Sequence, residues 1–326
     1  MSSMRGMPEI FTTEAFPPVP QRMLDEYDLG RPRRRRLVPL VLLLATCFFT
    51  YAAGTYKWMP LAFGQQFDET RGEYWDFHAT WQQLAANWQD GLTYAACVMG
   101  ILLAHEMGHF LMTVRYQIPA SYPIFLPMPL MVTGTMGAVI GMEGFRANRR
   151  QLFDIGIAGP LAGLVLVVPM VWIGIKIATP FNPAAGEIEF GAPLMVKLLA
   201  GWLRPDLHGA TPALNPVYMA GWVGMFVTGL NMMPVSQLDG GHVIYAIFLK
   251  RGHWIARLFL LSAIAFVVLS GQYSWTLMVV IVTLIGVDHP PTADDKMSLG
   301  IGRTILGLCS LVIPILCFTP FKFSVN

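Results

Sequence analysis

Five consecutive residues in an apolar stretch carry the side chains best suited to chemistry: His105, Glu106, Met107, Gly108 and His109. In a helix, residues four positions apart differ by about 40° around the axis, so both imidazoles can face one metal ion. Glu106 stands beside them, where it could take a proton from a water molecule on that metal. The spacing therefore predicts a metal-dependent hydrolytic site.

The surroundings of this motif point to a lipid bilayer. The letters ILLA precede it and FLM follow it, in a chain with only seven histidines. Ionisable groups in hydrocarbon cost about 2.5–3.5 kcal/mol each, so an intramembrane cluster indicates function. The alternative is a buried helix with two hydrogen-bonded histidines, and the five letters alone leave it open.

Composition supports the membrane environment. Charged residues make up 13% of the 326-residue chain, and the hydrophobic fraction is 54%. An ordinary soluble protein has about 25% charged residues, and no soluble single domain needs the balance seen here. The net charge of +2 gives no sign of nucleic-acid binding.

Long apolar runs must position the motif. They lie near residues 37–54, 92–114, 155–178, 216–235, 254–271, 273–287 and 302–320. Several approach the roughly 20 residues that a bilayer-crossing helix needs, whereas 273–287 is short and could be re-entrant. We therefore expect an all-α polytopic membrane protein with about six to eight transmembrane helices.

One apolar segment, residues 122–142, is incompatible with a regular helix. It contains Pro123, Pro127, Pro129, Gly134, Gly137 and Gly141. Prolines at this density prevent a helix, and β-branched residues among glycines fit a hairpin or a re-entrant loop. Such backbone lies at membrane depth only where protein buries it or where it lines a wet cavity. We expect a membrane-entering β-hairpin or loop here.

The first 36 residues differ in character from the rest. They are polar, too long for the charged part of a cleavable signal peptide, and end in the run RPRRRR. Directly before a membrane span, this run predicts a cytoplasmic anchor rather than a nucleic-acid-binding segment. We expect a cytoplasmic tail over 1–36 and one transmembrane catalytic domain over 37–326, with its core near 92–249.

The distribution of positive charge predicts an orientation. With the amino terminus inside and seven alternating spans, most of the 22 Lys and Arg residues fall on the cytoplasmic side. The positive-inside rule favours that topology. We therefore expect a multi-pass integral membrane protein whose N-terminus and active site lie toward the cytoplasmic side.

A protease metal site needs a third protein ligand and an open position for water. The segment NMMPVSQLDGGH, from Asn231 to His242, begins at the end of the fourth apolar run, and its Asp239 follows that run. In the topology above, its Asp239 reaches the same membrane face as His105 and His109. Asp and Gly are also ordinary turn residues, so Asp239 read alone favours a simple turn over a metal ligand.

The two motifs together resemble those of the site-2 protease family of intramembrane metalloproteases, which read HExxH and NxxPxxxxDG. This chain has HEMGH at 105–109 and NMMPVSQLDG at 231–240, without a departure. The resemblance covers roughly residues 92–300 and includes the central-span segment RRQLFDIGIAGPLAG at 149–163 and the hairpin at 122–137. These two segments, together with the letters AGW at 220–222 and HPP at 289–291, are most similar to the branch that includes plant chloroplast members.

This resemblance implies a fold, a cofactor and an activity. His105, His109 and Asp239 would bind one Zn²⁺ per chain, Glu106 would activate water, and Asn231 would hydrogen-bond the substrate carbonyl or the developing oxyanion. The protein would be an intramembrane zinc endopeptidase that cleaves transmembrane or membrane-proximal segments of other proteins. Its partners would be transmembrane protein substrates and the lipid bilayer.

Two other functions are alternatives to this one. A metal-ion transporter could use the His/Asp cluster as a transit site, but it would need several weak sites along a pathway and often shows inverted repeats. Neither feature is visible in the sequence. A catalytically silent membrane chaperone on the same fold is disfavoured, because every catalytic position is filled.

Several neighbouring residues could be mistaken for ligands. A fourth ligand at His242 would close the site to water, so we expect His242 to support the ligands or the fold instead. His208 and His289 are expected in loops, and Glu143 on the cytoplasmic surface. Gly159 and Gly163 are expected to let the central span approach its neighbours closely.

Overall fold

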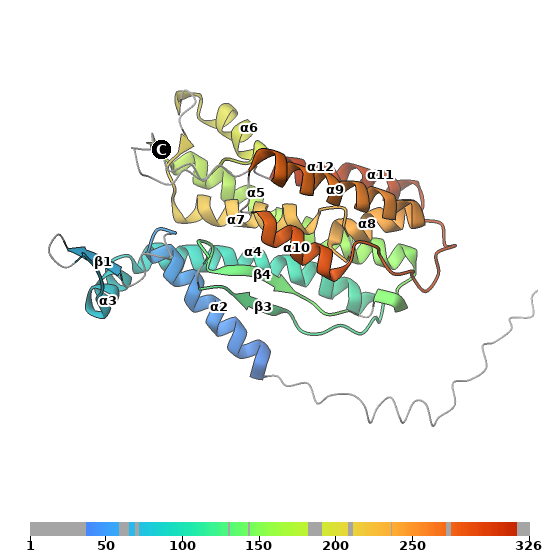
Figure 1. Cartoon of the computed structure of the whole chain (residues 1–326), viewed down its shortest axis with the longest axis horizontal. Coiled ribbons are helices and arrows are strands. Elements are labelled where there is room, and N and C mark those ends of the chain that lie inside the picture. Colours follow the sequence, from blue (N-terminus) through green and yellow to red (C-terminus); the bar gives the residue numbers. More distant parts are fainter. Residues whose placement is uncertain are drawn as a thin grey trace, which may run out of the picture. The chain divides into compact units, whose positions relative to one another are not determined.

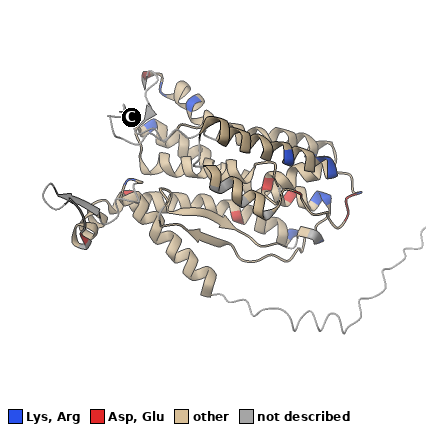
Figure 2. Ribbon diagram, viewed as in Figure 1, with Lys and Arg blue, Asp and Glu red and all other residues tan. Residues whose placement is uncertain are grey.

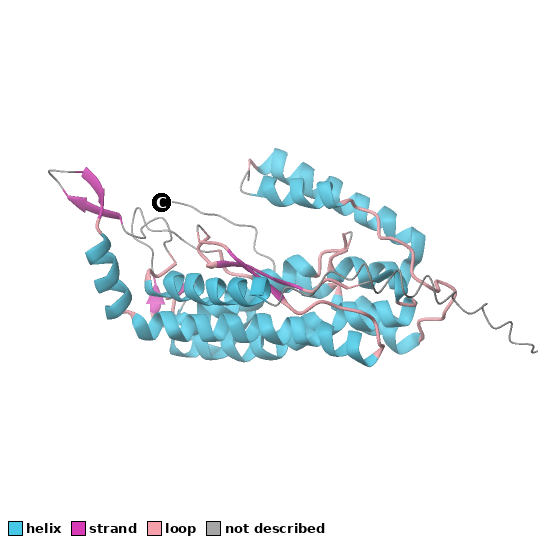
Figure 3. Ribbon diagram, turned by 90° about the horizontal axis from the view of Figure 1, so that it is seen from below, coloured by secondary structure: helices cyan, strands magenta, loops and turns pink. Residues whose placement is uncertain are grey.

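The computed structural model describes residues 37–58, 65–68, 72–129, 131–142, 144–181, 191–207, 211–235, 237–271 and 275–317. Helices dominate these residues, and the strands form three two-stranded antiparallel sheets (Figure 3). The expected tail over 1–36 lies outside the described residues.

The helices differ widely in length. The longer ones are α2 (Leu37–Thr55), α4 (Trp88–Arg115), α5 (Arg149–Ile177), α7 (Pro216–Asn231) and α9 (Gly252–Ser270). The shorter ones are α3 (Phe77–Ala86), α6 (Leu194–Leu203), α8 (Asp239–Phe248), α10 (Thr276–Ile285), α11 (Ile301–Ser310) and α12 (Val312–Cys317). The strand pairs are β1 (Gln65–Asp68) with β2 (Gly72–Trp75), β3 (Ile124–Pro127) with β4 (Thr135–Val139), and β5 (Pro180–Phe181) with β6 (Thr211–Pro212).

Helices α4, α5 and α7 pack against one another and form the core around the site (Figure 1). Glycines bring their backbones close together. A Cβ atom added at Gly108 on α4 would lie 2.5 Å from the carbonyl oxygen of Ala158 on α5. One added at Gly221 on α7 would lie 2.6 Å from a methyl carbon of Val171. Small residues at these points permit the close helix contacts that stabilise a protein in lipid.

Helix α5 begins earlier than the apolar run near 155–178 predicts. Its first residue is Arg149, because the Asn148 side chain accepts hydrogen bonds from the backbone N–H groups of Arg150 and Gln151. The Gln151 side chain in turn accepts from the Asn148 N–H and completes a capping box. This cap extends the helix over the polar residues before the apolar run, which hydropathy alone would leave outside the helix.

The expected hairpin near 122–142 is present. Strands β3 and β4 pair in antiparallel register, with Ile124 opposite Val139, and a further bridge joins Ala120 to Met142. Gly134, in the connecting turn, has φ +73°, and a Cβ added there would lie 2.5 Å from the carbonyl oxygen of Phe49 on α2. The turn therefore packs directly on α2, while β4 lies along α4 (Figure 1).

The membrane-span prediction is confirmed only in part. Four segments of the described chain are long and apolar enough to cross a bilayer: α2, α4, α5 and the segment Asp239–Ser270. The count of six to eight spans is not confirmed, since α7 has 16 residues and α10 has 10. The sequence prediction also missed α8, which Leu249, at φ 53°, separates from α9.

Candidate metal centre and active-site cavity

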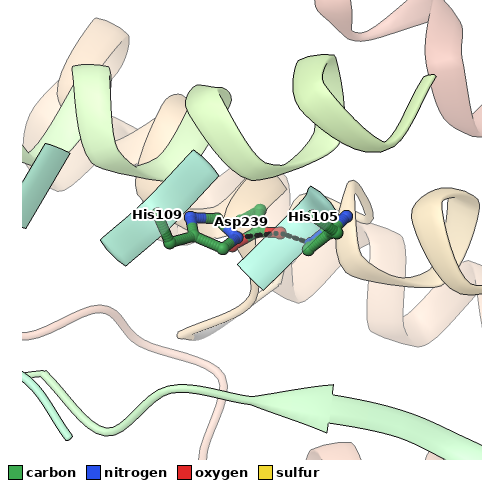
Figure 4. Close-up of side chains that lie close together, drawn as sticks. All are labelled: His105, His109 and Asp239. Atoms are coloured by element: carbon green, nitrogen blue, oxygen red, sulfur yellow. Dashed lines mark hydrogen bonds and ion pairs between the residues drawn. The ribbon is translucent and has the colours of Figure 1, made fainter. Parts of the chain in front are cut away.

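Residues from two distant segments meet at the centre of the helical core. His105 and His109 project from α4, and Asp239 is the first residue of α8. One Asp239 carboxylate oxygen lies 3.2 Å from His105 Nε2 and 3.3 Å from His109 Nε2. Figure 4 shows the carboxylate of Asp239 lying between the two imidazole rings. The simple-turn interpretation of Asp239 is wrong, because this residue starts a helix.

The donor set fits a zinc ion. The three side chains offer two imidazole nitrogens and one carboxylate oxygen, all within 4.8 Å of one another. Two histidines and a carboxylate are a common ligand set of catalytic zinc, with a further position left for water or substrate. His105 and His109 are both buried in the protein core. The arrangement could therefore hold a metal ion in a largely dry setting.

A backbone contact orients the His109 ring. Its Nδ1 lies 2.7 Å from the carbonyl oxygen of Ile155, and only a protonated nitrogen can donate to a carbonyl. The neutral ring then carries its lone pair on Nε2, the nitrogen that faces Asp239. Histidines that bind metals commonly have their other ring nitrogen held in this way.

Two glycines of α5 make room for the histidines of α4. A Cβ added at Gly159 would lie 2.0 Å from His109 Nε2, and one added at Gly163 would lie 3.2 Å from His105 Nδ1. Both rings therefore occupy space that a side chain on α5 would fill. The geometry agrees with the expectation that Gly159 and Gly163 permit a close helix approach, and adds that the histidines themselves need it.

Glu106 and Asn231 complete the expected set. Glu106 is 3% exposed and lines the same cavity as His109 and Asp239. Asn231 is the last residue of α7, and its Nδ2 lies 3.3 Å from His105 Nε2. The structure thus brings together all five residues that the two sequence motifs single out.

Four of these side chains line a cavity of about 500 Å³: Glu106, His109, Asn231 and Asp239. Helix α4 supplies one part of its lining, and the end of the hairpin, residues 138–142, supplies another. Leu238 and Asp239 lie at the start of α8, and His289 and Pro290 come from the loop that joins α10 to α11. The cavity is therefore bordered by both the end of the hairpin and the His/Asp cluster.

The α10–α11 loop (residues 286–300) is tied to its surroundings by hydrogen bonds. Ala293 N–H donates to the Ala147 carbonyl at 2.9 Å, and the Tyr245 hydroxyl donates to Asp295 at 2.8 Å. Burial raises the pKa of Asp295, but hydrogen bonds from Thr292 and Tyr245 outweigh it and lower that pKa below its ordinary value. The loop is thus anchored beside the cavity at several points.

The other candidate residues have different positions. His242 lies on α8 outside the cluster that could hold a metal, with its Nδ1 2.7 Å from His289 Nε2. His289 lies in a loop, as expected. His208 and Glu143 lie outside the described residues. Sequence reasoning missed the pairing of His242 with His289, for which no spacing signal exists across 47 residues.

Comparison with known proteins agrees with this geometry. The model of peptidase family M50 matches residues 93–270. The chain is 32% identical over 238 residues to "Probable zinc metalloprotease EGY1, chloroplastic" of Arabidopsis thaliana, covering 70% of this chain and 43% of that protein. It is 31% identical over 245 residues to the protein of the same name from Oryza sativa subsp. japonica, covering 71% and 41%.

A third relative is "Probable zinc metalloprotease EGY2, chloroplastic" of Arabidopsis thaliana, 27% identical over 251 residues, covering 72% of this chain and 43% of that protein. The chain spans less than half the length of these curated relatives. Their names support a zinc metalloprotease and give no support to the metal-ion transporter alternative. On the extent of the family match, the chain belongs to peptidase family M50, the site-2 protease family.

Proposed function

We propose that this protein is an intramembrane zinc endopeptidase that holds one zinc ion per chain through His105, His109 and Asp239. The observation that supports this most is the meeting of these three donors beside buried Glu106, with His109, Asp239 and Glu106 lining one cavity among apolar helices. Zinc, when bound, supplies a Lewis acid for the scissile carbonyl and lowers the pKa of water.

The remaining chemistry belongs to Glu106 and Asn231. Glu106 takes the proton of the attacking water and passes it to the leaving amine. A buried carboxylate can act as such a general base when it is held within hydrogen-bond reach of the reacting atoms. The Asn231 amide donates a hydrogen bond to the carbonyl oxygen, where negative charge develops. The Asn231 Nδ2 atom supports this role because it lies beside His105 on the cavity side of α7.

The hairpin offers a way to present the substrate. A transmembrane helix hides its peptide bonds, so the substrate must be locally extended before cleavage. The end of β4 lines the cavity, and an extended segment added beside it would bring a peptide bond toward the His/Asp cluster. The expected substrates are transmembrane or membrane-proximal segments of other proteins.

We further propose that the active site lies toward the cytoplasmic side, as the N-terminus does. Figure 2 shows Lys and Arg toward the ends of the helices. Arg149 and Arg150 stand at the start of α5, the end nearest the α10–α11 loop. In a cysteine-free background, a membrane-impermeant thiol reagent should label a cysteine at Asp294 from the cytoplasm and one at Asp206 from the other side. The opposite labelling would reverse this orientation.

The decisive experiment on activity compares Glu106→Gln with wild type. The change keeps the size and hydrogen bonding of the side chain but removes the carboxylate, so cleavage of a model transmembrane peptide should fall by about 10²–10⁴-fold. Zinc content should remain at about one per chain, because Glu106 is not a ligand. The double variant His105→Ala, His109→Ala should instead lose the zinc. Wild-type cleavage by Glu106→Gln would refute the proposal.

A further inference from the structure

Hydrogen bonds link the backbone of the α10–α11 loop, through His289, to His242 in the lining of the cavity. His289 Nδ1 lies 2.5 Å from the carbonyl oxygen of Pro290. His289 Nε2 lies 2.7 Å from His242 Nδ1. His289 and His242 both line the cavity that holds Glu106 and Asp239. None of these contacts involves a residue given a chemical role above.

The series determines which ring nitrogens carry protons. A carbonyl only accepts, so His289 Nδ1 carries a proton and donates to Pro290. A neutral His289 then has its lone pair on Nε2, and His242 Nδ1 must donate to it. A neutral His242 is left with its lone pair on Nε2. Among the described residues, none hydrogen-bonds that nitrogen.

Packing holds His242 in this position. The residue is 9% exposed, and the His289 ring packs edge-on against it, with ring centroids 4.9 Å apart. A Cβ added at Gly156 on α5 would lie 2.8 Å from the Cβ of His242. Gly156 therefore makes room for His242 as Gly159 does for His109. His242 therefore presents a hydrogen-bond acceptor in a fixed position to the cavity that it lines.

We propose that His242 Nε2 accepts a hydrogen bond from one backbone N–H of the extended substrate near the scissile bond. This inference rests on the proposed function. A strand paired with β4 directs alternate N–H groups away from β4, and a buried N–H without an acceptor is costly. His242, on the α8 part of the lining, supplies that acceptor. It is thereby a specificity-determining residue that disfavours proline at one substrate position, since proline has no N–H.

The test pairs a change in the enzyme with a change in the substrate backbone. The enzyme change is His242→Asn, because the Asn Nδ2 can replace Nδ1 as donor to His289 while nothing replaces Nε2. The probes are synthetic apolar peptides of about 25 residues in lipid vesicles, each carrying one N-methyl alanine at a different position around the cleavage site. His78→Asn, at an exposed residue of α3, is the matched control.

At one position, N-methylation should lower kcat/KM for wild type and His78→Asn by about five- to tenfold more than for His242→Asn, as expected for one hydrogen bond. At the other positions the losses should be equal, because steric costs are common to all three enzymes and cancel in the comparison. Equal losses at every position would overturn the inference. If wild type cleaves none of the peptides, unmethylated ones included, the proposed function itself fails.

A second measurement is independent of cleavage. In protein carrying ¹⁵N-labelled histidine, the nitrogen signals that disappear in His242→Asn belong to His242. At neutral pH they should show a protonated Nδ1 and an unprotonated Nε2. A protonated Nε2 would overturn the inference, because that nitrogen could not accept a substrate N–H.

Discussion

The two sides of the cavity are held in different ways. On the helix side, α4 and α5 approach so closely that Gly108 and Gly159 have no room for a methyl group. On the loop side, the α10–α11 loop is anchored by hydrogen bonds such as those of Ala293 and Asp295. The residues proposed to bind zinc lie where helix packing is tight, whereas the part of the lining that the loop supplies, His289 and Pro290, lies where hydrogen bonds dominate.

This difference has a physical meaning. Dense packing leaves no freedom for a ring to shift, and adding one methyl group to it costs about 1–3 kcal/mol. A partly exposed hydrogen bond contributes about 0.5–1.5 kcal/mol and can re-form with water. Reacting groups need fixed positions, whereas a loop that carries none of them can be held less tightly. Changes on the helix side should therefore have much larger effects than changes on the loop side.

The largest effect is expected for Gly159→Ala. Its Cβ would lie 2.0 Å from His109 Nε2, so the ring must move by roughly an ångström. A displacement of that size can cost about 10²-fold in rate, and here it also moves a proposed ligand. Cleavage of a transmembrane peptide should fall at least about a hundredfold, and the zinc content measured by elemental analysis should fall with it.

Gly100→Ala is the matched control on α4, because a Cβ added there meets no atom within 4 Å. Alanine favours a helix over glycine by about 1 kcal/mol, so this variant should be at least as stable as wild type and fully active. If both variants behaved alike, the tight helix side would not be what positions the ligands.

A smaller effect is expected for Gly163→Ala. Its Cβ would lie 3.2 Å from His105 Nδ1, so a few tenths of an ångström of movement would relieve the contact. Zinc should be retained, and the cleavage rate should fall by less than about tenfold. The ratio of the rate losses in Gly159→Ala and Gly163→Ala measures how strongly cleavage depends on the positions of the histidine rings. Equal losses for Gly159→Ala and Gly163→Ala would contradict the distances.

The smallest effect is expected on the loop side, at Asp295. Hydrogen bonds to its carboxylate lower its pKa in the folded state, so they stabilise the fold above the unfolded pKa of about 3.9 and are lost as pH falls through the folded pKa. Asp295→Ala removes them at every pH. At neutral pH it should destabilise the loop by about 0.5–1 kcal/mol, because solvent weakens such contacts.

Hydrogen exchange of residues 286–300 measures this effect directly. Wild type should exchange faster as the pH drops below about 4, whereas Asp295→Ala should exchange faster already at neutral pH and respond less to acid, after correction for intrinsic rates. Zinc content and cleavage at neutral pH should stay within about twofold of wild type. A hundredfold loss of cleavage in this variant would mean that cleavage depends on the loop side as strongly as on the helix side.

The sequence was a good guide wherever a feature depends on neighbouring residues. Helical spacing placed His105 and His109 on one face of α4, and prolines with glycines predicted the hairpin that β3 and β4 form. It was a poorer guide to element ends, since the cap at Asn148 extended α5 and a helix began at Asp239. Hydropathy predicted about six to eight membrane spans, and that count is not confirmed, since the described residues contain four helices long and apolar enough to cross a membrane.

By itself, then, the sequence determined the chemistry: which side chains are present, their order along a helix face, and the family to which their motifs belong. Only the tertiary structure decided that Asp239 meets His105, 134 residues away, at 3.2 Å. It alone showed that Gly156 makes room for His242 and that His242 pairs with His289. The physical reason is that spacing within one helix follows from fixed backbone geometry, whereas distances between segments depend on how whole helices pack.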